Sequence, residues 1–254
     1  MRNTIDAYSW DELSRISKLI QSSSDRTAAL SITDKYNLTD GNGKFIDASK
    51  TVVCNDGPTF RVKLIDVLHD SLSSENALAG MTFLATAPVA HRKMADNTVT
   101  NGGWSSSEIR KWLNAEFYDT LPNDLRSAMV SVDKYSNNIG KTLDDGCVTP
   151  TSDTLWIPSI VELCGPVDWE YFTDPSNASL FNSVFNREGT QYSYYCERHV
   201  LNEENNACLS IGEPWWLRST AASTGRGRFV SNGGDPSSFG DSNQSLGVVI
   251  GFCI

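Results

Sequence analysis

The chain has 254 residues, of which 39% are hydrophobic and 20% are charged, so it has the composition of a folded globular protein rather than a disordered one. The 31 acidic residues outnumber the 21 basic ones and give a net charge of −10, which argues against non-specific binding to nucleic acid. No apolar run approaches the ~20 residues of a membrane helix, so membrane insertion is not expected.

The first ten residues lack the basic start and apolar stretch of a secretory signal. We therefore expect a protein that stays in the cytoplasm or reaches a surface by another route. The six cysteines are scattered, with no C-x-x-C pair and no metal-ligand spacing, at positions 54, 147, 164, 196, 208 and 253. Buried thiols are the expected state and a disulfide framework is the alternative. We expect neither a metal nor a cofactor.

Capping signals and residue spacing predict the elements of the first 90 residues. A capping box from Ser9 to Glu12 begins a helix, whose buried face is expected to hold Leu13, Ile16, Leu19 and Ile20. The run 40–43 (Asp-Gly-Asn-Gly) predicts a tight turn rather than a calcium loop, because the distal glutamate of such a loop is missing. Alternating polarity over 59–67 predicts a half-buried strand, and 81–86 a second one.

The rest of the chain predicts short helices followed by short strands. A second capping box, Ser105 to Glu108, begins a helix that turns four residues inward: Ile109, Trp112, Leu113 and Phe117. A short helix follows Pro122, and a third box, Ser159 to Glu162, begins one that Gly165 ends. Residues 166–214 show little periodicity, and short strands follow at 215–218, 228–230 and 246–254. We expect one α+β domain over 1–254, with two or three helices beside small twisted antiparallel sheets.

Catalytic signals are weak throughout the sequence. None of His69, His91 and His199 lies in a recognisable nucleophile or metal context. The chain has no G-x-S-x-G, no P-loop and no H-E-x-x-H motif. Adjacent carboxylates such as Asp144-Asp145 are typical of solvated loops. No enzyme activity and no catalytic residue are therefore expected.

Residues 219–245, which we call the display segment, differ from the rest of the chain. Twenty of these 27 residues are Ser, Gly, Ala, Thr, Asn or Asp, and apolar runs flank them on both sides. Small polar side chains punctuated by Arg and Phe are typical of antibody paratopes; a plain surface loop is the alternative. The candidate ligand contacts are Ala222, Ser223, Arg226, Arg228, Ser231, Asp235, Ser237, Phe239, Asp241, Ser242 and Asn243. Arg228 and Phe239 are expected to contribute most to binding.

Several motifs together resemble a bacterial and phage domain with the C-type lectin fold, in the form shared with the formylglycine-generating enzyme. The motifs cover nearly the whole chain: Gly102-Gly103-Trp104, Ser107-x-x-Arg110-x-Trp112-Leu113-Asn114, Thr154 to Ser159 with Glu162, Gln191-Tyr192, Trp216-Leu217-Arg218-Ser219 and Gly247 to Phe252. Members that end in this way resemble the variable proteins of diversity-generating retroelements. Adenine-templated randomisation in those systems alters the C-terminal segment, here 215–254, while the fold stays fixed.

The resemblance implies a ligand-binding display protein whose target is a protein or glycan on another surface. It further implies attachment to a phage tail or a cell surface through an anchoring partner. The paired reactive cysteines of the formylglycine-generating enzyme have no counterpart here, and Glu213-Pro214-Trp215 departs from the calcium-lectin triplet. The alternatives are a thiol oxidase on the same fold and an invariant structural domain of a virion or envelope.

Overall fold

The computed structural model describes residues 4–169, 174–221 and 224–254. Its strands are β1 (Ser49–Val53), β2 (Thr59–Val67), β3 (Met81–Ala85), β4 (Ala90–Arg92), β5 (Val132–Asn137), β6 (Val148–Asp153), β7 (Trp215–Thr220), β8 (Gly227–Val230), β9 (Ser238–Gly240), β10 (Leu246–Val248) and β11 (Gly251–Cys253). Its α-helices are α1 (Trp10–Gln21), α2 (Arg26–Lys35), α3 (Glu108–Trp112), α4 (Tyr118–Thr120), α5 (Asn123–Ala128), α6 (Ile160–Cys164), α7 (Pro175–Asn186) and α8 (Ser193–Cys196). The class is α+β, as predicted, but with more helical segments than the two or three expected.

Helix α1 starts at the predicted capping box, because the Ser9 side chain accepts from the Glu12 amide while the Glu12 carboxylate accepts from the Ser9 amide. Leu13, Ile16 and Ile20 are buried, as expected, but Leu19 is 48% exposed. The ring of Trp10 lies 5.7 Å from Phe83 and 5.8 Å from Phe252. Helix α1 therefore packs on the same core as β3 and the last strand of the chain, β11.

The first sheet joins segments that are far apart in sequence. Its order is β1-β2-β3-β11, and all of its pairs are antiparallel. Strand β11 pairs with β3 through Phe252 opposite Phe83, and the two rings stack at 5.3 Å. A Cβ added to Gly251 would lie 2.2 Å from the Trp156 ring, so only glycine allows this close approach. The sheet is thus closed by the last strand of the chain.

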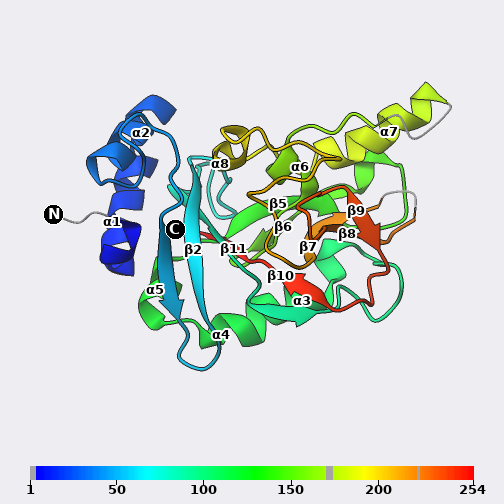
Figure 1. Ribbon diagram of the computed structural model, residues 1–254, viewed down its shortest axis with the longest axis horizontal. Helices are drawn as coiled ribbons and strands as arrows, with labels where there is room; N and C mark the ends of the chain where they lie inside the picture. The colour runs from blue at the N-terminus through cyan, green and yellow to red at the C-terminus, as the bar shows by residue number, and fades with distance from the viewer. Residues whose placement is uncertain (1–3, 170–173, 222–223) are drawn as a thin grey trace.

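The second sheet contains the two strands that lie within the display segment, β8 and β9. Its order is β4-β10-β7-β8-β9, and the contact of β10 with β7 is parallel while the other pairs are antiparallel. In Figure 1 this sheet and α7 lie at the end of the molecule opposite α1 and α2, with the β5–β6 hairpin between the two sheets. Among the residues that the structure describes, no helix has the length and apolar character needed to cross a membrane.

Three local predictions need correction. The helix expected from Ser105 begins instead at Ser107, whose side chain accepts from the Arg110 amide, because the preceding residues form a 3-10 turn. It continues through a π-helical turn, Leu113–Phe117, into α4. The range 166–214 contains two helices, α7 and α8. The β5–β6 hairpin was not anticipated at all.

Candidate functional site

The display segment forms an edge hairpin together with the loops on either side of it. Strands β8 and β9 pair antiparallel with Arg228 directly opposite Phe239, and β9 is the outer strand of its sheet. Arg226 precedes β8 and Asp241 follows β9, and their side chains form an ion pair at 3.0 Å. The hairpin thus brings Arg226, Phe239 and Asp241 close together, as a shared recognition surface requires.

Segments outside the display segment hold its backbone in place. The Thr100 amide and hydroxyl both donate to the Gly225 carbonyl, at 2.8 and 3.1 Å. The Ser242 amide donates to Thr98, and the Ser242 carbonyl accepts from Met94 and Ala95. The side-chain amide of Asn206 donates to the Gly234 carbonyl at 3.3 Å. These bonds use backbone groups of the segment and so do not depend on its side chains. Within the segment, the Ser231 and Asp235 side chains also fix the path, because they accept from the amides of Asp235 and Ser237 at 3.1 and 2.8 Å.

The predicted contacts divide by exposure. Arg226, Phe239 and Asn243 are exposed, and Ser231, Asp235 and Asp241 are partly exposed. Phe239 is 49% exposed, which is unusual for a large apolar ring and leaves area for a partner to cover. Ala222 and Ser223 lie outside the described residues.

Three predicted contacts are buried and stabilise the display segment instead of facing solvent. Ser237 accepts from the Glu203 amide at 2.6 Å, and Ser242 is fully buried. Arg228 is 3% exposed. Its guanidinium lies over the rings of Trp169, Phe185 and Phe239, at 4.7, 5.1 and 5.1 Å. Arg228 therefore packs on buried aromatic rings beside Phe239 instead of meeting solvent.

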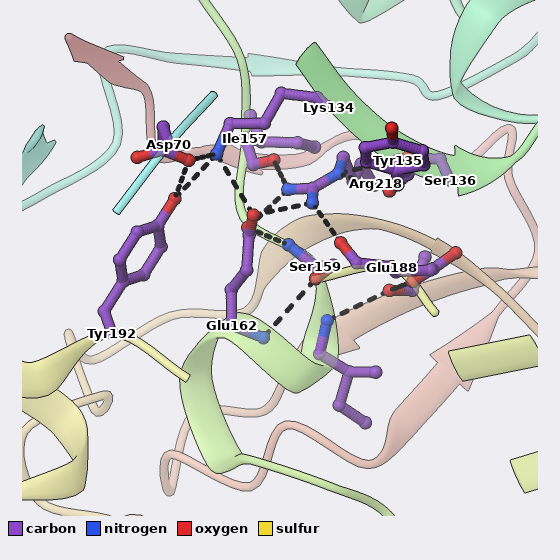
Figure 2. Close-up of polar contacts among 12 residues, drawn as sticks. Asp70, Lys134, Tyr135, Ser136, Ile157, Ser159, Glu162, Glu188, Tyr192 and Arg218 are labelled. Carbon is purple, nitrogen blue, oxygen red and sulfur yellow. Dashed lines mark hydrogen bonds and ion pairs between the residues drawn. The ribbon is translucent and has the colours of Figure 1, made fainter. Parts of the chain in front are cut away.

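A buried charged cluster lies at the start of the display segment, and Figure 2 shows its contacts. Arg218, on β7, donates to both carboxylate oxygens of Glu162 on α6, one of them at 2.7 Å. The other N–H groups of Arg218 reach Ser136 and three backbone carbonyls, those of Tyr135, Ile157 and Glu188. One guanidinium thus ties β7 to β5, α6 and the loop after α7.

Lys134 is the second buried cation of this cluster. Its ammonium group contacts the Asp70 carboxylate, lies 3.0 Å from Glu162 and donates to the Tyr192 hydroxyl at 2.7 Å. The ammonium also lies 3.6 Å from the centre of the Trp156 ring. Glu162 is therefore shared between Lys134 and Arg218, and burial is tolerated because each charge has a partner.

Glu188 is the third carboxylate of the cluster and makes different bonds. It accepts from the Asn137 amide at 3.0 Å and from the Ser219 hydroxyl. The Ser219 oxygen in turn accepts from the Ile160 amide at 3.0 Å. The side chains of Arg218 and Ser219 therefore both make buried hydrogen bonds within the cluster.

The surroundings shift the pKa values of these groups in opposite directions. Burial opposes ionisation of Asp70, but Lys134 outweighs it and holds the Asp70 pKa well below its usual range. Burial likewise opposes ionisation of Glu162, but Arg218 and Lys134 prevail and lower its pKa. For Glu188 burial prevails and raises the pKa to about 7. Asp70 and Glu162 are the structural anions, and Glu188 titrates near neutral pH.

A cleft of about 250 Å³ opens onto the cluster. Its lining includes Asp70, Glu162 and Glu188, together with His69 and Thr190. The His69 Nε2 atom lies 3.0 Å from the Thr190 hydroxyl, and burial works against the charged imidazole, but the neighbouring Asp70 raises its pKa. Within the described ranges, no group of three His, Cys, Asp or Glu residues is placed to hold a metal ion.

All six cysteines are free thiols. Cys54, Cys147, Cys164 and Cys253 are buried, Cys208 is partly buried and Cys196 is exposed. Burial raises the pKa of Cys164 to about 12, that of Cys253 well above its usual value, and that of Cys208 to a lesser extent. A raised pKa leaves little thiolate at neutral pH, so these thiols are poor nucleophiles.

Sequence reasoning identified Arg218, Ser219 and Glu162 as motif residues but not as one cluster. Lys134, Asp70 and Glu188 carried no local signal, because their partners within the cluster lie 28 to 122 residues away in the chain. A charged residue inside an otherwise strand-like run, such as Lys134 between Val132 and Ser136, is the one available hint of a buried ion pair.

The profile of a family described as a domain of unknown function, DUF6273, matches residues 79–254. This range contains the display segment and every member of the buried cluster except Asp70. Neither a curated protein nor a solved structure matches the chain.

Proposed function

The chain belongs to the DUF6273 family, and we propose that it is a non-enzymatic ligand-binding protein that displays side chains of the segment 219–245 on a fixed frame. The proposal rests on one observation: the backbone of that segment is held by hydrogen bonds to other parts of the protein, whereas several of its side chains are exposed. Its backbone is bonded to residues 94–100 and to Asn206, while Arg226, Phe239 and Asn243 extend into solvent. At these three positions the side chain can change without changing the path of the backbone.

The composition of the exposed set supports a macromolecular ligand. An exposed aromatic ring beside an arginine ion pair has the chemistry of interface hot spots. None of the clefts along α7, next to His69 or between α1 and α2 is lined by residues of 224–245. An exposed ring and ion pair of this kind suit a protein or glycan on a target surface better than a small molecule.

The proposal extends to the fold and the origin of the segment. The W-L-R-S motif and the C-terminal run from Gly247 support a C-type lectin fold of the formylglycine-generating-enzyme subtype. They equally support a role as the variable protein of a diversity-generating retroelement, carried on a phage tail or cell surface. Randomised A-A-pyrimidine codons cannot encode Lys, Glu, Gln, Met or Trp. The display segment holds only one of these residues, Gln244, which we take as a position that does not vary.

Sequencing the locus in a population of its carriers tests the proposal. We expect substitutions at exposed and partly exposed positions, such as 226, 231, 235, 239, 241 and 243. The same codons should match adenines in a near-identical downstream repeat beside a reverse-transcriptase gene. The buried Arg228, Ser237 and Ser242 serve as internal controls and should stay constant. A constant segment without a template repeat would refute the retroelement origin, and variation centred on the buried positions would refute the proposed frame.

A further inference from the structure

The buried cluster contains more negative than positive charge. Its three carboxylates and two cations are each at most 5% exposed: Asp70, Glu162, Glu188, Lys134 and Arg218. Lys134 serves Asp70 and Glu162, and Arg218 serves Glu162. The Glu188 carboxylate has no cation in hydrogen-bonding contact among the described residues, because Arg218 donates to its backbone carbonyl instead. A buried charge without a counter-ion is costly, so such a group takes up a proton.

The other titratable groups around Glu188 do not remove this excess at alkaline pH. Arg218 faces it from β7 and Glu162 from α6, while Asp133 and Lys134 come from β5. His69, Asp70 and Arg187 line the same cleft. His69 supplies a positive charge only when protonated. Burial raises the pKa of Glu188 to about 7, so the carboxyl group is neutral in mildly acidic solution and ionised in alkaline solution.

Glu188 is connected on both sides to the base of the display segment. Its Oε2 atom bonds to Ser219, the fifth residue of β7. Its Oε1 atom accepts from the amide of Asn137, whose side chain holds Gly140 through bonds of 2.7 and 2.8 Å. Gly140 lies against the backbone of Thr100, which donates to the Gly225 carbonyl. Both bonds by themselves favour the ionised carboxylate, but burial outweighs them, so a charge that appears at Glu188 raises the free energy of the packing around β7 and around Gly225 before β8.

We propose that Glu188 is a proton-controlled latch: β7 and the Gly225 backbone before β8 are held firmly while Glu188 is neutral and less firmly once it ionises. The latch itself is a property of the folded chain. Its effect on ligand recognition, firmer display in mildly acidic solution and looser display in alkaline solution, rests on the proposed function.

Hydrogen exchange of the full chain without any ligand tests the latch. Amide exchange in β7 and β8 is followed at pH 6 and pH 8, with rates corrected for the intrinsic pH dependence of exchange. A carboxyl group with a pKa of about 7 when closed and an ordinary value when open predicts about a tenfold rise in opening between these pH values. In Glu188→Gln the neutral side-chain amide keeps an acceptor for Asn137 but cannot ionise, so the tenfold rise in opening between pH 6 and pH 8 should disappear. The control Glu116→Gln removes a 79% exposed carboxylate and should leave the rise intact.

Direct titration of Glu188 by carbon NMR in the unmodified chain keeps the test independent of the variant's folding. A Glu188 that titrates near its ordinary value, with equal protection at both pH values, would overturn the latch. A full tenfold rise in Glu188→Gln would also overturn it, since the proton would then reside on His69. No ligand takes part in these measurements, so a negative result would not bear on the proposed display function. Conversely, a display segment that is constant among carriers would refute the retroelement origin but not the latch.

Discussion

Replacing Arg218 tests whether the buried cluster holds the second sheet to the rest of the molecule. In Arg218→Met, Glu162 keeps one of its two cations, Lys134, while Ser136 and the carbonyls that Arg218 served lose a donor. Removing one partner of a buried ion pair costs about 3–5 kcal/mol. Each orphaned acceptor adds on the order of 1 kcal/mol where water cannot replace the donor. Because Glu162 keeps Lys134, the ion-pair loss should lie near the lower end of that range, and water should replace the donor at some of the four acceptors. We therefore expect a total loss of about 5 kcal/mol in the free energy of unfolding.

Urea unfolding measures this loss as a fall in the denaturation midpoint at constant slope. The matched comparison is a double-mutant cycle with Glu162→Gln, which keeps the helix cap because glutamine also serves at this position of a capping box. With both charges removed, Lys134 and Asp70 still balance each other, so the double variant should recover about 2 kcal/mol of the Arg218→Met loss.

The pH dependence of the same variant has a defined sign. Arg218 and Lys134 lower the pKa of Glu162, so the pair contributes stability above the ordinary glutamate pKa and loses it as pH falls through the lowered value. Without Arg218 the Glu162 pKa rises, and the difference between wild type and Arg218→Met should shrink toward low pH. A loss under 1 kcal/mol, or strictly additive losses in the cycle, would refute this account of the cluster.

Other residues allow further tests. Phe239→Ala should change the free energy of unfolding by no more than about 0.5 kcal/mol, because the ring is half exposed. Arg228→Ala should cost about 2 kcal/mol, because it removes the stacking on the buried rings of Trp169 and Phe185 and the hydrogen bond to the Ser237 carbonyl. Thermal melts of both variants measure these losses of stability. Equal losses in the two variants would contradict the assignment of Arg228 to the buried support and of Phe239 to the exposed surface. Alkylation of the native chain followed by mass spectrometry should modify Cys196 first and leave Cys164 and Cys253 intact. Rapid labelling of either buried thiol would favour a thiol oxidase instead.

Local signals in the sequence were enough to predict the elements that depend on a few neighbouring residues. The capping boxes at Ser9 and Ser159 both form as expected, since each involves side chains only three residues apart. The Ser105 box failed because the Ser105 hydroxyl donates to the Gly102 carbonyl and joins a 3-10 turn, so the cap passes to Ser107.

Elements that depend on tertiary contacts were not predictable in this way. Helix α7 is rich in Asn and Ser, which are modest helix formers, and it is stabilised by Phe181 and Phe185 against Trp169. That same aromatic group covers the inner face of β8, which is why Arg228 is buried and not displayed. The sequence proposed the candidate site only as a segment, and dividing that segment into buried and exposed residues required this packing.

The closure of the first sheet by β11 has a consequence for folding kinetics. Thr82 on β3 and Cys253 on β11 touch although they are 171 residues apart, so this contact closes a very long loop. Non-local pairing of this kind slows folding, and the edge of β3 stays open to other chains until it forms. The exposed side chains of the display segment lie within that loop and make no part of the contact. Substitutions at positions such as 226, 239 and 243 should therefore leave the folding rate unchanged. A variant with different exposed side chains would then reach its native state as quickly as the present sequence does.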